Sequence, residues 1–379
     1  MNSEDKKMKV AFVLGALNRG GTESLILDIC RCANRTPFEV VCIYRKEGNL
    51  SEEFHKTNAR LIYIPKSGSM IGYMWKLRKV IQKERITIVH SQTPSNTAVL
   101  GLSLFGCKTK LLTTIHGFSF LNSNKLYQHF VFGISKAILF VSNYQKKIYL
   151  QTCSGILQKK CNVVYNGIDT TKYGTEYEIP KFYKDLDNTL KLCVVGNIRS
   201  ARTYDVILKA IYYLRKDGLN NVGLYIIGNT PIEEQYKLDY YRKLCKEYEI
   251  NDVVHFVGSR SDVPAILQSS DIYIMSSIET FGISVVEAIM SKVPVIVNDF
   301  NVMQEITEYG KLATLYKTGD SYDLAEKIKY VVNNFEYYRA KAFDDSEYVK
   351  EKYSIENCIS QLNKIYIYGA SGGSENDNH

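Results

Sequence analysis

Short apolar runs alternate with polar segments along the first 170 residues of the chain. The polar segments carry apolar positions every three or four residues, a spacing that predicts amphipathic helices. The apolar runs are rich in Val, Ile and Leu, and they predict buried strands over residues 8–15, 38–44, 59–65, 86–90, 110–116, 137–142 and 162–167. Buried strands that alternate with helices are typical of a parallel sheet covered by helices on both faces.

The same alternation restarts after residue 189. Residues 170–189 are polar, contain Gly and Pro and show no clear periodicity, so we expect a linker there. Beyond it, further apolar runs predict strands over residues 190–196, 223–228, 252–258, 271–277 and 293–297. The predicted fold class is therefore α/β, with two doubly wound, Rossmann-like domains that face each other across a ligand cleft at the carboxyl ends of their strands.

The predicted organisation has five parts. An N-terminal domain covers residues 1–170, a linker 171–189, and a C-terminal domain 190–352. A helix over residues 353–368 follows, and we expect it to pack back towards the N-terminal domain. The last residues, 369–379, are rich in Gly, Ser and Asn, and we expect this tail to be disordered.

Composition places the chain among ordinary globular proteins. Its 379 residues are enough for two domains, and 45% of them are hydrophobic while 23% are charged. No apolar run approaches the roughly 20 residues of a membrane span, and the N-terminal run lacks a signal-peptide cleavage site. The nine cysteines form no C-x-x-C pair, so we expect reduced, half-buried thiols rather than a zinc site or disulfides. We interpret the chain as cytoplasmic.

Charge is distributed unevenly between the two halves of the chain. Residues 1–170 carry 24 Lys and Arg against 10 Asp and Glu, whereas residues 171–379 carry 24 against 30. A strongly basic half predicts an anionic partner such as a membrane surface, a phosphorylated ligand or a nucleic acid. Nucleic acid is disfavoured, because the chain contains no recognisable nucleic-acid-binding module.

One basic segment, residues 70–85, contains Trp75 and five cationic side chains. It can form a basic amphipathic helix that touches an anionic membrane surface. It can equally pack Leu77, Val80 and Ile81 against the sheet and leave its cations in water. The sequence leaves both readings open.

The loop after the first predicted strand contains Gly20 and Gly21. It does not fit the G-x-G-x-x-G dinucleotide fingerprint, and Gly21 stands where a phosphate-binding loop of the NTPase type needs lysine. What remains is a loop whose backbone N–H groups can approach an anion just before a helix N-terminus. A plain strand-to-helix turn is the alternative.

The second domain opens with a comparable loop. A strand ends at Gly196, and Arg199 and Arg202 follow before the next helix. Two guanidinium groups at the mouth of a doubly wound sheet suit a diphosphate, because each can bind phosphate oxygens with a fork of N–H donors. Solvated loop arginines are the alternative.

Two glutamates flank an aromatic–glycine pair in the stretch IETFGISVVEA, residues 278–288. Glu279 follows a predicted strand, Gly282 stands at the entry to the next helix, and Glu287 lies a little over one turn into that helix. With a glycine hinge here, both carboxylates can reach one ligand whose diphosphate rests on the helix N-terminus. Carboxylates accept hydrogen bonds from hydroxyls, which favours a sugar. Two solvated glutamates are the alternative.

Taken together, these stretches resemble the donor-binding signature of GT-B glycosyltransferases of the retaining family 4 type. The family pattern places two glutamates eight residues apart with Phe-Gly between them and Pro-Val after them, and residues 279–297, ETFGISVVEAIMSKVPVIV, match it. The resemblance extends over nearly the whole chain through LNRGGTES, TTIHGFS, FVSNYQKK, VVYNGID, VVGNIR and EKYSIEN. The set is specific as a whole, although no single motif is.

The resemblance implies roles for individual residues. Glu279 and His116 are expected at the donor sugar as catalytic residues, and Glu287 at the ribose hydroxyls. Further matching positions are expected to bind the sugar and the diphosphate of the donor: Gly20, Gly21, Arg199, Arg202, Phe281, Gly282 and Ile283. The segment around Gly258 and Arg260 is expected to hold the base.

The sequence departs from the family pattern at two places. Asn197 stands where the family often has arginine, and Arg202-Thr203 stands where it has Lys-Gly. Arg199, two residues after Asn197, is a candidate to supply the missing cation. If it does not, we expect a lower donor affinity.

The resemblance also implies the chemistry. A hexosyl or N-acetylhexosaminyl unit would move from a nucleotide-diphosphate sugar, UDP favoured over GDP, with retention and without a bound metal or cofactor. No D-x-D-type metal motif is evident. The expected acceptor is a glycan or lipid-linked glycan of cell-surface polysaccharide assembly, at the inner face of the membrane. A sugar-nucleotide epimerase of the same fold and a non-catalytic partner subunit are the alternatives.

Overall fold

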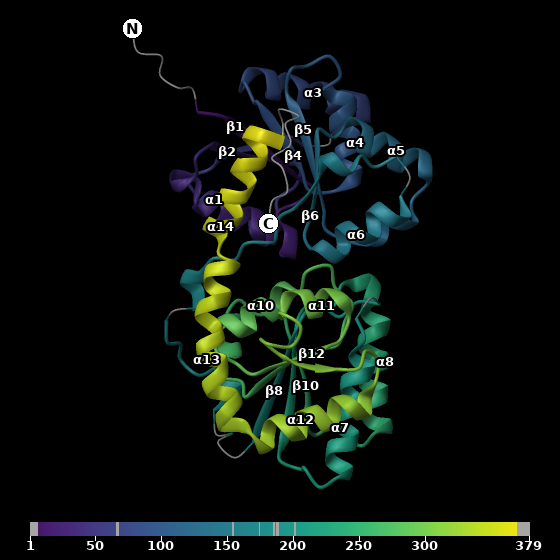
Figure 1. Cartoon of the computed structure of the whole chain (residues 1–379), viewed down its shortest axis with the longest axis vertical. Coiled ribbons are helices and arrows are strands. Elements are labelled where there is room, and N and C mark those ends of the chain that lie inside the picture. Colours follow the sequence, from purple (N-terminus) through teal and green to yellow (C-terminus); the bar gives the residue numbers. More distant parts are fainter. Residues whose placement is uncertain are drawn as a thin grey trace. The chain divides into compact units, whose positions relative to one another are not determined.

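The computed structural model describes residues 7–65, 68–153, 155–173, 175–184, 186, 189–200 and 202–369. The chain divides into two compact units (Figure 1): unit 1 comprises Met1–Asp169 and Tyr353–His379, and unit 2 comprises Thr170–Lys352. Residues 370–379, which form nearly all of the tail predicted as disordered, lie outside the described part of the chain.

Unit 1 is built on a seven-stranded parallel sheet in the order β3-β2-β1-β4-β5-β6-β7. Its strands are β1 Lys9–Leu14, β2 Glu39–Tyr44, β3 Arg60–Tyr63, β4 Ile88–Ser91, β5 Lys110–Ile115, β6 Ala137–Phe140 and β7 Cys161–Val163. All seven were predicted, because each is a continuous apolar run. The strand order reverses between β1 and β4, which is where ligands of doubly wound sheets bind.

Helices cover both faces of this sheet. They are α1 Gly21–Arg31, α2 Ser51–His55, α3 Met70–Lys83, α4 Pro94–Ser103, α5 Lys125–Ile134, α6 Asn143–Thr152 and, from the end of the chain, α14 Ile355–Lys364. Alternate residues of β1 point to opposite faces. Phe12 shares a core with residues of α1 and α14, whereas Val13 shares one with residues of α3 and α4. The C-terminal helix is therefore part of the core of unit 1.

Unit 2 repeats the arrangement with six parallel strands in the order β10-β9-β8-β11-β12-β13. These are β8 Leu190–Val195, β9 Val222–Ile227, β10 Val254–Gly258, β11 Ile272–Met275, β12 Val295–Asn298 and β13 Thr314–Tyr316. The strand order reverses between β8 and β11. The predicted α/β class with two doubly wound sheets is confirmed, although the three-residue edge strand β13 was not predicted.

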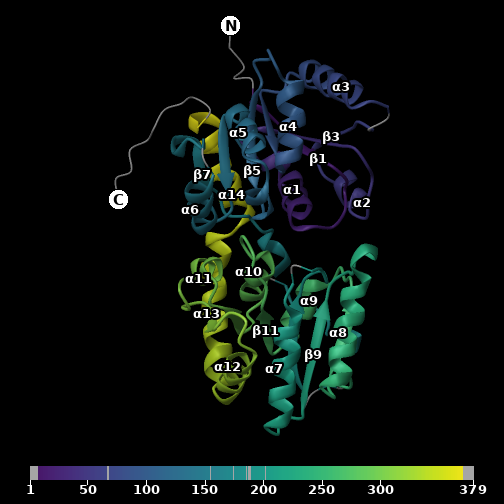
Figure 2. The same cartoon turned by 90° about the vertical axis from the view of Figure 1, so that its right-hand side faces the viewer.

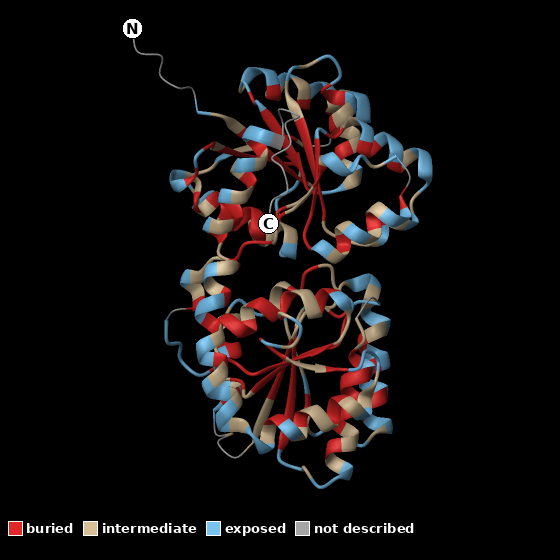
Figure 3. Ribbon diagram, in the orientation of Figure 1, coloured by how far each residue is buried: buried red, intermediate tan, exposed pale blue. Residues whose placement is uncertain are grey.

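The helices of unit 2 are α7 Tyr204–Lys216, α8 Gln235–Glu247, α9 Val263–Gln268, α10 Ile283–Met290, α11 Asn301–Ile306, α12 Ser321–Asn333 and α13 Phe335–Lys352. Residues of α7, α8 and α12 share one apolar core with β8 and β9 (Figure 2), including Ile207, Leu238 and Ile328. Buried residues follow the strands and the helix sides that face them (Figure 3).

The predicted linker packs onto unit 2. It contains two short 3₁₀ turns, Thr170–Tyr173 and Lys181–Tyr183, and the side chains of Tyr173 and Tyr183 are buried. The Tyr183 hydroxyl lies 3.0 Å from the Ser270 hydroxyl at the end of α9. Tyr173 and Tyr183 therefore anchor the predicted linker, although its polar composition alone predicts a segment without fixed contacts.

Two further observations concern the whole chain. All nine cysteines are free thiols, and eight of them are buried rather than half-buried as predicted. Within the described ranges, no helix combines the length and apolar character needed to cross a membrane.

Candidate functional site

The carboxyl ends of β8 and β11 lie next to each other at the reversal point of the unit 2 sheet. The loop after β8 carries Arg202 and the loop after β11 carries Glu279, and Arg202 Nη1 lies 3.0 Å from Glu279 Oε1. Both side chains are largely shielded, with 21% and 27% of their surface exposed. The structure thus brings a cation and a carboxylate, predicted from separate motifs, into one ion pair.

Buried tyrosines hold the loop that carries Arg202. The Tyr204 hydroxyl donates to the Gly196 carbonyl at 2.7 Å, and the Tyr241 hydroxyl donates to the Arg202 carbonyl at 2.7 Å. Burial of the guanidinium acts to lower the pKa of Arg202, but the Glu279 carboxylate, together with smaller contributions from Tyr204 and Tyr273, raises the pKa above its ordinary value. Arg202 is therefore a permanent cation in a fixed position.

Reciprocal hydrogen bonds join the same loop to the end of β11. Thr203 Oγ1 donates to the Ser276 carbonyl and Ser276 Oγ donates to the Thr203 carbonyl, both at 2.9 Å. The Asn298 amide donates to the Ser276 and Ser277 carbonyls at 2.7 and 3.0 Å. The loops that carry Arg202 and Glu279 are thus fixed to each other and to β12.

A close backbone contact completes this arrangement. A Cβ added to Gly228, at the end of β9, would lie 2.0 Å from the Gly196 carbonyl oxygen. Only glycine fits there without moving the backbone. Beside it, the Asn229 N–H donates to Asn197 Oδ1 at 3.0 Å. The side chain of Asn197, one of the two departures from the family pattern, therefore binds the neighbouring loop.

Gly282 turns the chain from the Glu279 loop into α10. Its φ of 85° is left-handed, a conformation that L side chains rarely adopt, and Ile283 begins the helix. The Phe281 side chain is only 2% exposed, so this residue can meet a ligand mainly through its backbone. The first N–H groups of α10 have no partner within the helix, which makes its N-terminus suitable for an anion.

Glu287 is the fifth residue of α10, and its carboxylate already has a partner. The Tyr173 hydroxyl, from the predicted linker, donates to Glu287 Oε1 at 2.8 Å. Sequence reasoning did not identify Tyr173, because the two residues lie 114 positions apart and no local pattern joins them.

Three of the predicted residues lie apart from the ion pair. Arg199 is exposed on the same loop as Arg202. Gly258, with a φ of 81°, ends β10, and the Arg260 guanidinium donates to both oxygens of Asp262 at 2.8 and 2.6 Å. Because β10 is the edge strand and β9 separates it from β8, Gly258 and Arg260 lie to one side of the reversal point.

In unit 1, the predicted glycines stand at the start of α1. Gly20 is the residue before the helix and Gly21 is its first residue. Gly20 is extended, with a φ of −158°, so it is not needed for a left-handed turn. A Cβ at this position would lie 2.6 Å from Glu23 Oε2. The Glu23 carboxylate therefore occupies the space beside Gly20 at the start of this helix.

His116 follows β5 and is held by a residue that the sequence did not indicate. Its Nε2 donates to Gln92 Oε1 at 2.8 Å, and Gln92 follows β4. Burial lowers the pKa of His116 to about 4. The ring is therefore neutral near pH 7, with the proton on Nε2.

A second histidine, His90 in β4, lies within the same part of unit 1. Its Nδ1 is 2.7 Å from the Tyr366 hydroxyl and its Nε2 is 2.7 Å from the Thr114 hydroxyl. A neutral ring satisfies both contacts, since each hydroxyl can donate or accept. Burial, with a smaller effect from His116, lowers the pKa of His90 to about 3.

The comparisons with known proteins match both units. The family described as "Glycosyltransferase Family 4" matches residues 19–172, and the family described as "Glycosyl transferases group 1" matches residues 177–342. The first match spans Gly20, Gly21 and His116, and the second spans every predicted residue of unit 2.

Individual relatives cover most of the chain. CapH of Staphylococcus aureus, a capsular polysaccharide biosynthesis glycosyltransferase, is 22% identical over 372 residues, 95% of this chain and 99% of CapH. An Escherichia coli UDP-Gal:alpha-D-GlcNAc-diphosphoundecaprenol alpha-1,3-galactosyltransferase is 22% identical over 324 residues, 79% of this chain and 82% of that protein. The structure of Anabaena HepE in complex with UDP and glucose matches with a TM-score of 0.83 at 17% identity, over 95% of this chain and 99% of HepE.

The neutral state of His90 makes the stability of unit 1 depend on pH. Between pH 7 and pH 5 an unfolded histidine gains a proton, whereas His90 in the fold does not, so stability falls as the pH falls. We expect His90 to account for about 2 kcal/mol of unfolding free energy lost over this range. Urea unfolding at each pH measures this loss of unfolding free energy. The signal is the fluorescence of Trp75, the single tryptophan and a residue of unit 1.

The matched variant is His90→Gln, whose amide keeps hydrogen-bonding groups but does not titrate. Its unfolding free energy should fall less between pH 7 and pH 5 than that of the wild type. His55→Gln, an exposed histidine of the same unit, is the control and should leave the wild-type dependence unchanged. Equal pH dependence in the wild type and His90→Gln would contradict the assignment.

Proposed function

The chain belongs to the family 4 glycosyltransferases of the GT-B fold, and we propose that it moves a hexosyl or N-acetylhexosaminyl unit from a nucleotide-diphosphate sugar to a glycan, with retention. The observation that carries this proposal is the Arg202–Glu279 pair at the reversal point of the unit 2 sheet. This pair provides a guanidinium that can bind a diphosphate and a carboxylate that can accept hydrogen bonds from a sugar. The N-terminus of α10, which begins four residues beyond Glu279, supplies further donors to an anion.

We propose that Arg202 and the first N–H groups of α10 bind the diphosphate. A guanidinium has five N–H donors, so Arg202 can bind a phosphate oxygen while it keeps its contact with Glu279. These groups stabilise the charge that develops on the departing nucleoside diphosphate. In this proposal the protein's own groups perform this role without a metal ion or cofactor, and Arg199 supplements them from the same loop.

In this proposal, Glu279 and Glu287 contact different parts of the donor. Glu279 contacts the sugar, where its negative charge stabilises the positive charge that develops at the reacting carbon. Glu287 accepts hydrogen bonds from the ribose hydroxyls, since a carboxylate can accept from a ribose and from Tyr173 at once. Phe281 and Gly282 contribute their backbone, and the neutral His116 of unit 1 acts as a hydrogen-bonding partner of the sugar.

We propose UDP rather than GDP as the nucleotide and place its base by Gly258 and Arg260. The crystallised relative HepE binds UDP, and the Escherichia coli relative is named for a UDP-galactose donor. The name of the Escherichia coli relative also contains a diphosphoundecaprenol-linked acceptor, and CapH is named for capsular polysaccharide biosynthesis. These names support a glycan or lipid-linked acceptor in cell-surface polysaccharide assembly.

An acceptor on a lipid requires contact with a membrane, and α3 offers a suitable surface. Trp75 is 60% exposed and Phe105, after α4, is 84% exposed, while Ile71 is also exposed. The Arg78 guanidinium donates to the Ser103 and Phe105 carbonyls, which joins the two helices. Exposed apolar side chains beside the lysines of α3 suit an anionic lipid surface. We propose that this α3 surface binds the inner face of the cell membrane.

The proposed function is tested first by nucleotide binding and transfer. UDP should raise the melting temperature more than GDP or ADP, because a ligand of the folded state stabilises it. A UDP-sugar with a lipid-linked glycan should then yield an extended glycan and free UDP. An epimeric sugar nucleotide formed from the donor alone, detected by NMR, would identify the epimerase alternative instead. Binding without transfer to any acceptor offered would overturn the enzymatic assignment.

The roles of the two glutamates are separable. Glu287→Gln should weaken UDP binding about tenfold and change kcat little. Glu279→Gln should lower kcat about 100-fold or more and leave UDP affinity nearly unchanged. Tyr173→Phe should weaken UDP binding by less than Glu287→Gln, since it only removes the group that positions the carboxylate. Calorimetric titration of UDP and steady-state kinetics measure both quantities.

The control for these variants is Glu247→Gln, an exposed residue at the last position of α8 that belongs to none of the proposed site loops. It should bind UDP and turn over as the wild type does. If Glu279→Gln and Glu287→Gln change the same parameter to the same extent, the division of roles is wrong even though the chain transfers sugar.

Membrane contact is tested with lipid vesicles. The wild type should sediment with vesicles that contain phosphatidylglycerol and less with pure phosphatidylcholine. A triple variant, Ile71→Ser, Trp75→Ser and Phe105→Ser, should bind about tenfold more weakly. The control carries Ile232→Ser and Tyr309→Ser, which are exposed in unit 2, and should bind as the wild type does. Equal binding by the triple variant would refute the α3 surface.

A further inference from the structure

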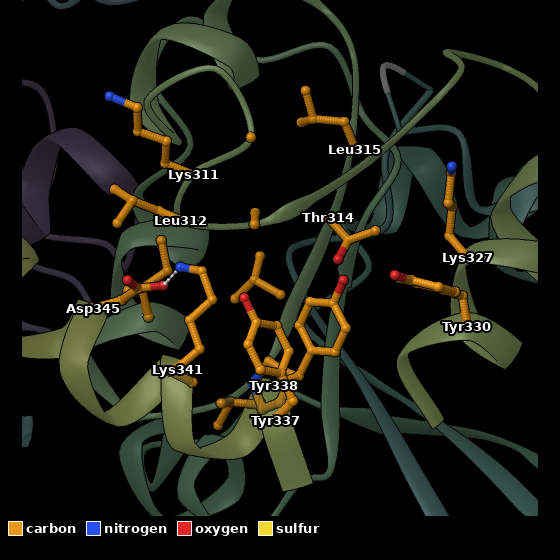
Figure 4. A pocket seen from close by; sticks show the side chains of 17 residues that line it. Lys311, Leu312, Thr314, Leu315, Lys327, Tyr330, Tyr337, Tyr338, Lys341 and Asp345 are labelled. Carbon is orange, nitrogen blue, oxygen red and sulfur yellow. Dashed lines mark hydrogen bonds and ion pairs between the residues drawn. The ribbon is translucent and has the colours of Figure 1, made fainter. Parts of the chain in front are cut away.

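A pocket of about 420 Å³ opens beside the edge strand β13 of unit 2 (Figure 4). Its wall combines residues 310–315 with the start of β12, the end of α10 and parts of α12 and α13. The volume lies within the range of small-molecule sites, about 300–1,000 Å³. None of the predicted site residues lines it.

The pocket is separate from the site at the reversal point. Val295, the first residue of β12, lines the pocket, whereas Asn298 at the other end of that strand holds the site loops. Ile283 begins α10 at the site, and Ile289 of the same helix lines the pocket. A rise of 1.5 Å per residue separates these two residues by about 9 Å along the helix axis.

Tyrosine side chains and apolar residues line the pocket. Tyr337 and Tyr338 lie side by side in the middle of the pocket (Figure 4), with ring centroids 5.2 Å apart. Tyr330 lies at one side, and Leu312 is among the apolar lining residues. A tyrosine ring offers an apolar face and a hydroxyl together. This combination suits a sugar ring, which also has apolar C–H groups on its faces and hydroxyls around its edge.

The lining is basic in an otherwise acidic unit. Lys311, Lys327 and Lys341 line the pocket with a single acid, Asp345, which pairs with Lys341. Residues 170–352 as a whole carry 23 Lys and Arg against 27 Asp and Glu. Lys311 and Lys327 lie on opposite sides of the view in Figure 4, with the tyrosines between them. The lining of the pocket is therefore net positive, whereas unit 2 as a whole is net negative.

We propose that this pocket binds an anionic saccharide, a glycan segment that carries carboxylates. The tyrosines pack against sugar rings, and the separated lysines bind acid groups at different points along the chain of sugars. A compact phosphate would instead favour clustered cations or the forked donors of arginine, and no arginine is among the described residues that line the pocket. This function goes beyond sugar transfer, because it provides a second saccharide site away from the proposed donor site.

Binding is tested on the whole chain without a donor, so that the result does not depend on the proposed function. A hexamer of galacturonic acid should bind in calorimetric titration, and the neutral maltohexaose should bind at least about tenfold more weakly. Raising the salt concentration should weaken binding of the acidic hexamer, because exposed charges are screened. No binding of the acidic hexamer, or equal binding of both hexamers, would overturn the proposal.

Two variants locate the site. Lys311→Ala with Lys327→Ala should weaken binding of the acidic hexamer about tenfold, and Tyr337→Ala should weaken it as well. The matched control, Lys243→Ala with Lys246→Ala, removes two positive charges from α8 and should bind as the wild type does. All variants should keep the wild-type far-UV circular dichroism and thermal unfolding transition, which shows that unit 2 is folded.

Hydrogen exchange gives an independent readout of location. The acidic hexamer should slow exchange of backbone amides in residues 310–315 and 327–345, whereas UDP should not. Protection confined to other parts of the chain, or loss of binding in the α8 control as large as in the pocket variant, would show that general charge rather than this pocket attracts the hexamer.

Discussion

The reciprocal hydrogen bonds between Thr203 and Ser276 are the constraint on which the unit 2 site depends. Parallel strands β8 and β11 bring their carboxyl ends together, but strand pairing alone does not set the course of the loops that follow. Thr203 directly follows Arg202, and Ser276 precedes Glu279 by three residues. Fixing these two points to each other fixes the origin of both charged side chains, so the ion pair forms between groups that the loops already direct towards each other.

The two departures from the family pattern gain a physical explanation in this arrangement. Thr203 replaces glycine and uses its hydroxyl to hold the end of β11, and Asn197 replaces arginine and accepts from the Asn229 N–H. These departures motivated the alternative of a non-catalytic subunit. Because both side chains stabilise the loops of the site and Arg202 remains in place as a cation, the departures are compatible with the proposed donor site.

Local pattern predicted much of the fold and drew attention to both members of the Arg202–Glu279 pair, but not to the residues that hold their loops in place. Continuous apolar runs located twelve strands, and Gly282 marked the start of α10 because its left-handed φ needs glycine. The strand β13 was missed because three residues give no periodicity. Tyr173, Ser276 and Gln92 were missed for another reason: each acts through a partner far away in the sequence or across the sheet. Such contacts are a property of the tertiary structure, which one sequence does not reveal.

The Arg202–Glu279 pair also stabilises the cation of the proposed diphosphate site before a ligand binds. A guanidinium in a largely dry position is costly unless an opposite charge accompanies it. Glu279 provides that charge, so the cation can remain buried and in position without a ligand. In the proposed reaction the diphosphate binds Arg202 and the first amides of α10. Arg202 then shares its positive charge between the diphosphate and Glu279, so its attraction to the Glu279 carboxylate weakens. The carboxylate then becomes more available to the sugar at the stage when positive charge develops there. Binding of the diphosphate and electrostatic stabilisation of the sugar are thereby linked through one ion pair.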